Sequence, residues 1–201
     1  MTRVAVLDYG MGNLRSVARA VERVGGQPVI TEDAREATGA DGLVVPGVGA
    51  FGACVGALRA QGLDRVVTDL VAADRPVLGV CLGMQVLFDR GEESDAPGLG
   101  VLSGRVRRLP DGVKVPHMGW NEVAWTRPHD LVAGIPSGTR FYFVHSYVCE
   151  PQEDLVAART DHGGSFASAV ARGSLFATQF HPEKSGDAGL ELYRNFVKGL
   201  S

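Results

Sequence analysis

The segment Pro76–Gln85, PVLGVCLGMQ, runs from apolar residues into a cysteine flanked by glycines, and it decides the fold and the chemistry expected of this chain. If Pro76–Val80 is a strand and a helix follows it, Cys81 lies on a sharp turn, which is the thiol version of the nucleophile elbow. Gly79 and Gly83 lack a Cβ, so the chain can turn there and other backbone can approach closely. The expected helical pattern after the turn consists of Met84, Leu87 and Phe88. Free N–H groups at the start of that helix would favour a thiolate, so we predict that Cys81 is a nucleophile. The alternative is a buried structural cysteine, the commoner fate of a free Cys.

A candidate base stands near the end of the chain. Phe180–Glu183, FHPE, follows the strand-like run Ser174–Gln179. A proline disfavours helical backbone for the residue before it, which predicts an extended tripeptide in which His181 and Glu183 point to the same side. Glu183 would then accept a hydrogen bond from one ring nitrogen while the other faces Cys81. The alternative is a surface loop with an incidental His and Glu.

The composition favours an ordinary globular enzyme. The chain has 201 residues, of which 45% are hydrophobic and 21% charged, and its formal charge is -3. This length suits one well-cored domain, so a single domain over residues 1–201 is expected. No dense Lys/Arg block occurs, and the nearest cluster (Arg105, Arg107 and Arg108) alternates with apolar residues as on the wet face of a strand. Nucleic acid and anionic membranes are therefore poor candidates as partners.

The cysteines and histidines argue against metal and disulfide roles. Cys54, Cys81 and Cys149 are odd in number and widely spaced, which favours a reducing compartment and hence a cytoplasmic enzyme, with Cys54 and Cys149 as structural residues. The apolar run Val4–Leu7 is too short for a signal peptide or a membrane span. The five histidines show no ligand spacing, so no metal is predicted. Gly10-Met11-Gly12 is an incomplete dinucleotide fingerprint because Arg15 stands at the third glycine position, and no cofactor is predicted.

The order of predicted elements changes in mid-chain. The first part alternates short strands (Val4–Leu7, Pro28–Ile30, Gly42–Val45 and Pro76–Val80) with helices, one of them capped by Asn13 and two others over Cys54–Leu58 and Leu63–Val71. Strand-like runs then dominate: Val101–Leu109, Asn121–Trp125, Thr139–Val148, Leu155–Arg159, Phe166–Ala171 and Ser174–Phe180. A final helix is expected from about Asp187. These patterns predict a flavodoxin-like, three-layer α/β sandwich whose central parallel or mixed sheet has an antiparallel extension in its second half.

A thiol that attacks a carbonyl needs donors for the developing oxyanion. The backbone N–H of Leu82, next to the nucleophile, is one candidate. A second is expected from the glycine loop Pro46–Gly49, which follows a parallel strand and therefore ends at the same sheet edge as the elbow. The alternative is an ordinary glycine-rich turn at a strand end.

Taken together, these motifs resemble the class I (triad) glutamine amidotransferases, and within them the glutaminase subunits of imidazole glycerol phosphate synthases. The resemblance extends along the whole chain. It is carried by Asp8–Asn13 (DYGMGN), Pro46–Phe51 (PGVGAF), Gly79–Gln85 (GVCLGMQ), Pro116–Asn121 (PHMGWN), Phe143–Tyr147 (FVHSY) and Gln179–Ser185 (QFHPEKS). The elbow and the His-Pro-Glu are shared by the superfamily, whereas the first and fourth segments point to this subunit.

The resemblance implies a mechanism and a set of contacts. Cys81 would attack the side-chain amide of glutamine, His181 would protonate the leaving ammonia and later activate water, and Glu183 would orient His181. The amides of Gly49 and Leu82 would hold the oxyanion. The residues expected to bind glutamine are Gly47, Gln85, Ser146 and Tyr147.

The resemblance also implies a partner. The family passes ammonia to a (β/α)8-barrel cyclase subunit, which makes imidazole glycerol phosphate and AICAR in histidine biosynthesis, so a heterodimer is expected. The residues expected at its interface are Asn13, Trp120, Tyr142 and Lys184. An exposed Trp is a plausible anchor, although a core Trp is as common.

Three other functions remain open at this point. The first is a glutaminase that serves another acceptor, in anthranilate, purine or pyridoxal phosphate synthesis; the segment His117–Asn121 argues against it. The second is a cysteine peptidase or thiol hydrolase built on the same sheet. The third is a non-catalytic interaction subunit, which the intact Cys81, His181 and Glu183 disfavour.

Overall fold

The computed structural model describes residues 2–200, so the ends of the predicted domain, Met1 and Ser201, lie outside the described residues. The strands are β1 (Arg3–Leu7), β2 (Gln27–Thr31), β3 (Gly42–Gly47), β4 (Val77–Cys81), β5 (Phe88–Gly91), β6 (Leu102–Arg108), β7 (His117–Trp125), β8 (Thr139–His145), β9 (Tyr147–Pro151), β10 (Val156–Asp161), β11 (Ser165–Arg172) and β12 (Leu175–Thr178). The α-helices are α1 (Leu14–Arg23), α2 (Ala34–Thr38), α3 (Phe51–Ala60), α4 (Leu63–Ala72), α5 (Leu82–Gln85) and α6 (Gly186–Gly199). Three short 3-10 helices complete them: η1 (Asp130–Val132), η2 (Glu153–Leu155) and η3 (Pro182–Lys184).

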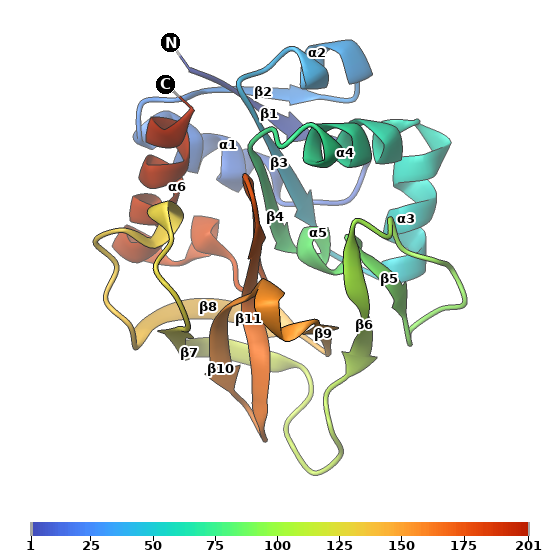
Figure 1. Ribbon diagram of the computed structural model, residues 1–201, viewed down its shortest axis with the longest axis vertical. Helices are drawn as coiled ribbons and strands as arrows, with labels where there is room; N and C mark the ends of the chain where they lie inside the picture. The colour runs from blue at the N-terminus through green and yellow to red at the C-terminus, as the bar shows by residue number, and fades with distance from the viewer. Residues whose placement is uncertain (1, 201) are drawn as a thin grey trace.

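The first half of the sheet is parallel and lies between two helical layers. Its strands run in the order β2-β1-β3-β4-β12, and each neighbouring pair is parallel. Successive side chains of β1 point to opposite faces, so Val4 and Val6 join one core while Ala5 and Leu7 join the other. Helices α1 and α6 cover the first face, and α3 and α4 cover the second (Figure 1). This confirms the predicted three-layer sandwich.

The second half of the sheet is antiparallel along its main path, as predicted, whereas β5 and β6 in its side branch pair in parallel. It continues from β12 through β11, β10 and β7 to β8 in the lower part of Figure 1. A side branch joins β11 to β9, β9 to β6, and β6 to β5. The single strand predicted over Thr139–Val148 is wrong, because the chain bends at Ser146 and divides it into β8 and β9. The carbonyl oxygen of Ser146 accepts a hydrogen bond from the Leu109 N–H at 2.9 Å, which fixes that bend against the end of β6.

The helix after the elbow is much shorter than the sequence pattern predicts. Helix α5 ends at Gln85, and Phe88, which was assigned to the helical stripe, begins β5. The reason is that the carbonyl oxygens of Val86, Leu87 and Phe88 accept hydrogen bonds from backbone N–H groups of residues 99–102. Because these carbonyl oxygens already accept from residues 99–102, they are not available to the N–H groups of a further helical turn.

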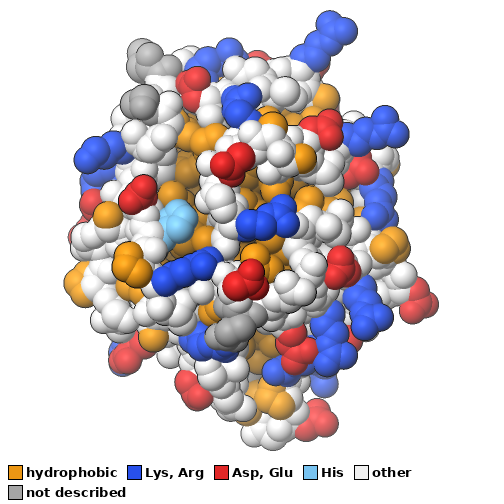
Figure 2. Space-filling model, in the orientation of Figure 1, with side chains coloured by type: hydrophobic (Ala, Val, Ile, Leu, Met, Phe, Trp, Pro, Cys, Tyr) orange, Lys and Arg blue, Asp and Glu red, His pale blue; other side chains and the backbone are white. Residues whose placement is uncertain are grey.

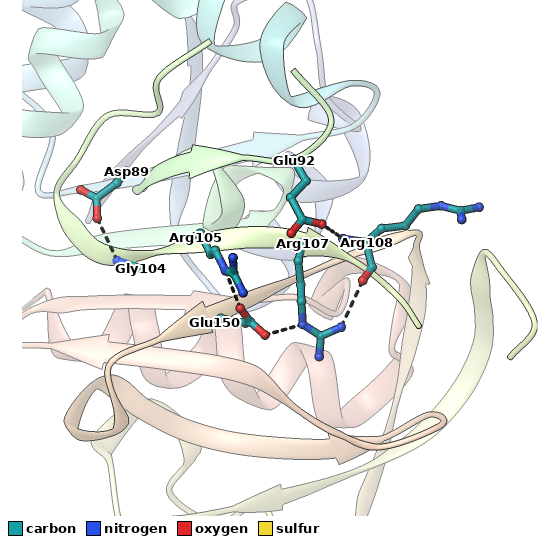
Figure 3. Close-up of polar contacts among 7 residues, drawn as sticks. All are labelled: Asp89, Glu92, Gly104, Arg105, Arg107, Arg108 and Glu150. Carbon is teal, nitrogen blue, oxygen red and sulfur yellow. Dashed lines mark hydrogen bonds and ion pairs between the residues drawn. The ribbon is translucent and has the colours of Figure 1, made fainter. Parts of the chain in front are cut away.

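Two of the arginines on β6 form ion pairs with a carboxylate on the neighbouring strand. Arg105 and Arg107 both reach Glu150 on β9, and the Nε of Arg105 lies 2.7 Å from a carboxylate oxygen (Figure 3). On the face shown in Figure 2, side chains of both charge signs are interspersed. Between residues 2 and 200, no helix combines the length and the apolar character that crossing a bilayer requires.

Close backbone packing holds the elbow onto the sheet. A Cβ on Gly83 would lie 1.8 Å from the carbonyl oxygen of Val45 on β3, and a Cβ on Gly79 would lie 2.9 Å from the carbonyl oxygen of Gly83. Neither glycine has a positive φ. These two glycines therefore serve close approach, as the sequence predicted, and the sharp turn itself falls elsewhere.

We expect Gly83→Ala to lower the free energy of unfolding by about 3 kcal/mol or more, because the added methyl group meets backbone that cannot move aside. The matched control is Gly56→Ala in α3, where a Cβ meets nothing within 4 Å. That change replaces an exposed helical glycine and should stabilise the protein by roughly 0.5–1 kcal/mol. Chemical denaturation of both variants tests the packing, and a Gly83→Ala variant as stable as the Gly56→Ala variant would contradict it.

Candidate active site

The turn at the end of β4 falls on Cys81 itself. Its φ of 55° and ψ of -109° lie in a region that non-glycine residues rarely adopt. Such a conformation costs on the order of 1–3 kcal/mol and persists where the surroundings enforce it. Here the surroundings are β3, whose Gly47 is the register partner of Cys81, and the tightly packed Gly83. The side chain is 6% exposed and therefore sits just below the surface.

Parallel pairing brings His181 to the same sheet edge. Strands β4 and β12 are neighbours, with Val80 opposite Thr178, so the residues that follow each strand emerge side by side. His181 keeps an extended backbone, with φ -102° and ψ 94°. Its N–H donates to the carbonyl oxygen of Tyr142 at 2.9 Å, and its carbonyl oxygen accepts from the Ser185 hydroxyl at 2.6 Å. The backbone of the histidine is thereby held on both sides.

Glu183 reaches the histidine by a different route from the one predicted. His181 is extended, but Pro182–Lys184 forms the 3-10 helix η3, so the extended tripeptide is only partly correct. The tight turn still directs the Glu183 carboxylate back to the ring, and His181 Nδ1 lies 2.8 Å from Glu183 Oε1. Both side chains are almost fully buried, at 2% and 1% exposure. A buried carboxylate that accepts from Nδ1–H fixes the orientation of the imidazole.

Opposing effects set the protonation of His181. Burial disfavours the charged ring, but hydrogen bonding and charge interactions with Cys81 and Glu183 outweigh it and raise the pKa of His181 to about 10. The imidazole therefore carries its second proton at neutral pH. Nε2 is buried and, apart from Cys81, has no hydrogen-bond partner among the described residues, so its proton is not held by another group.

A cavity of about 390 Å³ opens beside Cys81. This volume suits a small ligand. Among the residues predicted to act in the site, those that line the cavity are Gly49, Cys81, Leu82, Gln85, Ser146 and Tyr147. Gly47, predicted to bind glutamine, does not line it: a Cβ there would lie 2.8 Å from the Gly83 nitrogen, so this glycine serves backbone packing behind the cavity.

The glycine loop after β3 borders the cavity beside Cys81, as the predicted oxyanion donor requires. Gly49 has φ +106°, which a side chain would strain, and it lines the cavity together with Leu82, the first residue of α5. N–H groups at the start of a helix have no partner within the helix and remain free for a ligand. The Tyr9 hydroxyl donates to the carbonyl oxygen of Pro46 and so holds the base of this loop.

Two polar residues of the site were not predicted. The amide of the fully buried Gln179 donates to Cys81 Sγ at 3.7 Å, and its oxygen accepts from Gln85 at 3.0 Å. Gln179 stands two residues before His181, so the same strand periodicity could have identified it. Glu93 is the only carboxylate among the described residues that line the cavity, and it accepts from the Phe51 N–H at 2.6 Å. No sequence motif marks Glu93, because a loop brings it there.

In residues 2–200, no group of three or more His, Cys, Asp and Glu side chains is arranged to hold a metal ion.

Three of the four residues predicted at a partner interface, Trp120, Tyr142 and Lys184, lie together on the β7–β8 hairpin and beside it. Trp120 is 55% exposed and stands opposite Tyr142, with ring centroids 6.2 Å apart. The Lys184 Nζ lies 5.8 Å from the centroid of the Tyr142 ring. Asn13 is the N-cap residue of α1, as predicted, although its side chain makes no capping hydrogen bond. The neighbouring Met118 is 57% exposed and was not predicted.

Comparison with known proteins identifies the family. Residues 5–200 match the family described as Glutamine amidotransferase class-I. The chain belongs to this family. It is 51% identical over 197 residues to the imidazole glycerol phosphate synthase subunit HisH of Dehalococcoides mccartyi, a match that covers 97% of this chain and 96% of that relative. It is 53% identical over 202 residues to the protein of the same name from Mycolicibacterium paratuberculosis, with 98% of each chain covered. The solved structure of PurLQS from Thermotoga maritima matches the fold of this amidotransferase with a TM-score of 0.79 at 20% identity, over 100% of this chain and 99% of that one.

We expect Glu183→Gln to lower the pKa of His181 by at least about one pH unit, because a neutral amide no longer stabilises the charged ring. An NMR titration of the histidine ring measures this directly. The control is Glu122→Gln on β7, an exposed carboxylate in an ion pair with Arg140 at 3.2 Å, which should leave the titration unchanged. If both variants titrate like the unmodified protein, Glu183 does not set the charge of the imidazole.

Proposed function

We propose that this chain is the glutaminase subunit of an imidazole glycerol phosphate synthase, which hydrolyses glutamine to glutamate and ammonia. The observation that carries the proposal is the joined set of Cys81, His181 and Glu183 beside a cavity of about 390 Å³, in a chain 51% identical to a HisH subunit over nearly its full length. The same identity favours this acceptor over those of the other synthases considered from the sequence.

The first half of the reaction uses the Cys81 sulfur and the protonated imidazole of His181. The Cys81 thiolate attacks the side-chain amide carbon of glutamine, and the amides of Gly49 and Leu82 hold the oxyanion. The Nε2 proton of His181 passes to the leaving nitrogen, so ammonia departs and a glutamyl thioester remains on the sulfur. Glu183 keeps the imidazole aligned during this transfer.

The second half restores the enzyme. Neutral His181 takes a proton from water, and the resulting hydroxide adds to the thioester carbon. Collapse of that intermediate breaks the C–S bond, which releases glutamate and returns Cys81 as a thiolate beside protonated His181. The reaction consumes one water molecule for each ammonia produced.

The walls of the cavity suit the amino-acid end of glutamine. Gln85, Ser146 and Tyr147 line it, and Gln85 donates to the carbonyl oxygen of Tyr147 at 3.1 Å. Glu93 supplies a carboxylate for the α-ammonium group, which needs a negative partner once it leaves water. In this proposal Gly47 supports the loop rather than contacting the substrate.

The partner is a (β/α)8-barrel cyclase subunit that forms a heterodimer with this chain and uses the ammonia to make imidazole glycerol phosphate and AICAR. Support comes from the exposed aromatic face at Trp120 and Tyr142, flanked by Lys184. This face extends to the cavity, because Val144 on its rim is the register partner of exposed Met118. Asn13, in the loop before α1, completes the proposed interface.

Two further assignments complete the proposal. One amidotransferase domain spans the chain, which the family match over residues 5–200 and the continuous sheet from β2 to β8 support. The location is cytoplasmic, which three free, buried cysteines favour.

We expect Cys81→Ala to reduce glutamine-dependent synthesis by the complex to less than about one thousandth, because no other group replaces the nucleophile. Synthesis from added ammonia should stay near the unmodified rate. Cys54→Ser is the control: Cys54 donates to the Tyr9 hydroxyl at 3.3 Å, and a serine keeps that donor. Loss of ammonia-dependent synthesis as well would mean that Cys81 is required for assembly, and full glutamine-dependent synthesis would overturn the mechanism.

We expect Trp120→Ala to weaken binding to the cyclase subunit by about 30-fold or more, the effect typical of a large aromatic anchor at an interface. Ile30→Ala is the matched control, since Ile30 is also an exposed apolar side chain, at 43%, but lies on the distant edge strand β2. Isothermal titration calorimetry with the purified cyclase measures both. Equal affinities for the two variants would exclude this hairpin face as the docking surface.

A further inference from the structure

Two buried histidines outside the triad lie against the wall of the cavity. His145 lines the cavity and is 6% exposed, and His117 on the neighbouring strand is 5% exposed. They are register partners in the β7–β8 hairpin. The proposed mechanism uses neither of them.

The two rings belong to a continuous chain of hydrogen bonds that is anchored on backbone at both ends. His145 Nδ1 lies 2.9 Å from the carbonyl oxygen of Tyr147, and His145 Nε2 lies 2.9 Å from His117 Nδ1. On the far side, His117 Nε2 lies 3.2 Å from the Asn121 amide nitrogen. That nitrogen also donates to the carbonyl oxygen of Asp161 at 2.8 Å.

The anchors determine the direction of every bond. A carbonyl oxygen only accepts, so His145 carries its proton on Nδ1 and its Nε2 must accept from His117. His117 is then protonated on Nδ1, and its Nε2 must accept from the Asn121 amide. The Asn121 side chain is oriented independently, because its oxygen accepts from the Glu122 N–H at 2.8 Å. One tautomer of each ring satisfies the whole chain.

Burial keeps both rings in that form. It lowers the pKa of His145 to about 3 and that of His117 to about 4, the latter helped by the nearby His162. A second proton on His145 would set two N–H groups against each other across the 2.9 Å contact with His117, and a second proton on His117 would do so across the 3.2 Å contact with Asn121. The chain is therefore neutral and directional at neutral pH.

The end of this chain is the point where the glutamine pocket is assembled. The carbonyl oxygen of Tyr147 also accepts from Gln85, and Gln85 donates to Gln179, which in turn donates to the Cys81 sulfur. The bend at Ser146, between His145 and Tyr147, is thus held from one side by the histidines and from the other by the glutamines. Its position depends on both.

We propose that His117 and His145 are positioning residues for glutamine binding, which hold the Ser146–Tyr147 bend through a hydrogen-bond chain of fixed direction. The inference rests on the proposed glutaminase function. Neither ring touches the reacting atoms. Their removal should therefore weaken the binding of substrate more than it slows the chemical step.

The kinetic test compares three variants in the complex with the cyclase subunit. His117→Leu removes the hydrogen bonds of the ring to His145 and to Asn121. It should raise KM for glutamine about tenfold, which corresponds to the free energy of about one hydrogen bond, and should leave kcat within about twofold. His117→Asn places an amide donor near the Nδ1 position and should recover most of that loss. His162→Phe is the control, because His162 stacks on His117 with centroids 4.1 Å apart but takes no part in the chain. A KM for His117→Leu equal to that of the control overturns the proposal.

A second measurement does not depend on activity or on the stability of any variant. Long-range 1H–15N NMR of the unmodified protein should show both His117 and His145 neutral and protonated on Nδ1 at pH 7. Protonation of either ring on Nε2 instead overturns the chain, even if His117→Leu fails to fold. Failure of the unmodified complex to hydrolyse glutamine would overturn the proposed function, whereas an unchanged KM in an active complex overturns only this inference.

Discussion

The parallel pairing of β4 with β3 on one side and β12 on the other is the interaction on which the site depends. Register alone places Gly47 opposite Cys81 and Thr178 opposite Val80. Because the strands are parallel, the residues that leave their carboxyl ends meet at one edge: the glycine loop, the elbow and the His181 segment. The proposed nucleophile, base and oxyanion loop come from widely separated parts of the sequence, and the backbone pairing of adjacent parallel strands brings them together.

The same pairing explains how the strained backbone of the proposed nucleophile, Cys81, is maintained. Cys81 adopts a positive φ, and the cost is met by packing in which Gly83 lies directly against the Val45 carbonyl. The buried His181–Glu183 pair is a second local cost, offset by a short hydrogen bond and by the Cys81 side chain. Cys81 ends β4, and His181 and Glu183 follow β12, so both costs fall at the carboxyl ends of two neighbouring parallel strands. The strained residue and the buried ion pair are therefore held by backbone that the sheet already fixes.

The sequence predicted the features that depend on neighbouring residues, and it missed those that depend on contacts between distant segments. Apolar runs such as Val77–Val80 and turn residues such as Gly83 act locally, so the parallel strands and the elbow were predicted well. The length of α5 was not, because residues 99–102 compete for the carbonyl oxygens of Val86–Phe88. Short α2 was missed, although Asp33 caps it by accepting from two backbone N–H groups. Glu93 reaches the cavity only through the path of a loop, and a one-dimensional pattern does not contain that path.

The two walls of the cavity are held by different kinds of structure, and this difference bears on how the enzyme works. The wall that carries the oxyanion loop and the elbow is fixed by the backbone of a parallel sheet. The opposite wall is the bend at Ser146, whose flanking residues His145 and Tyr147 are tied to strand β7 and to Gln85 by side chains. Side-chain hydrogen bonds have direction, so this wall has one preferred position rather than a range. Strand β7 supplies His117 to that wall and presents Trp120 to solvent on its other face. One strand therefore contributes to both the proposed substrate pocket and the proposed docking surface, and the hydrogen bonds of His117 and His145 connect it to the Tyr147 carbonyl.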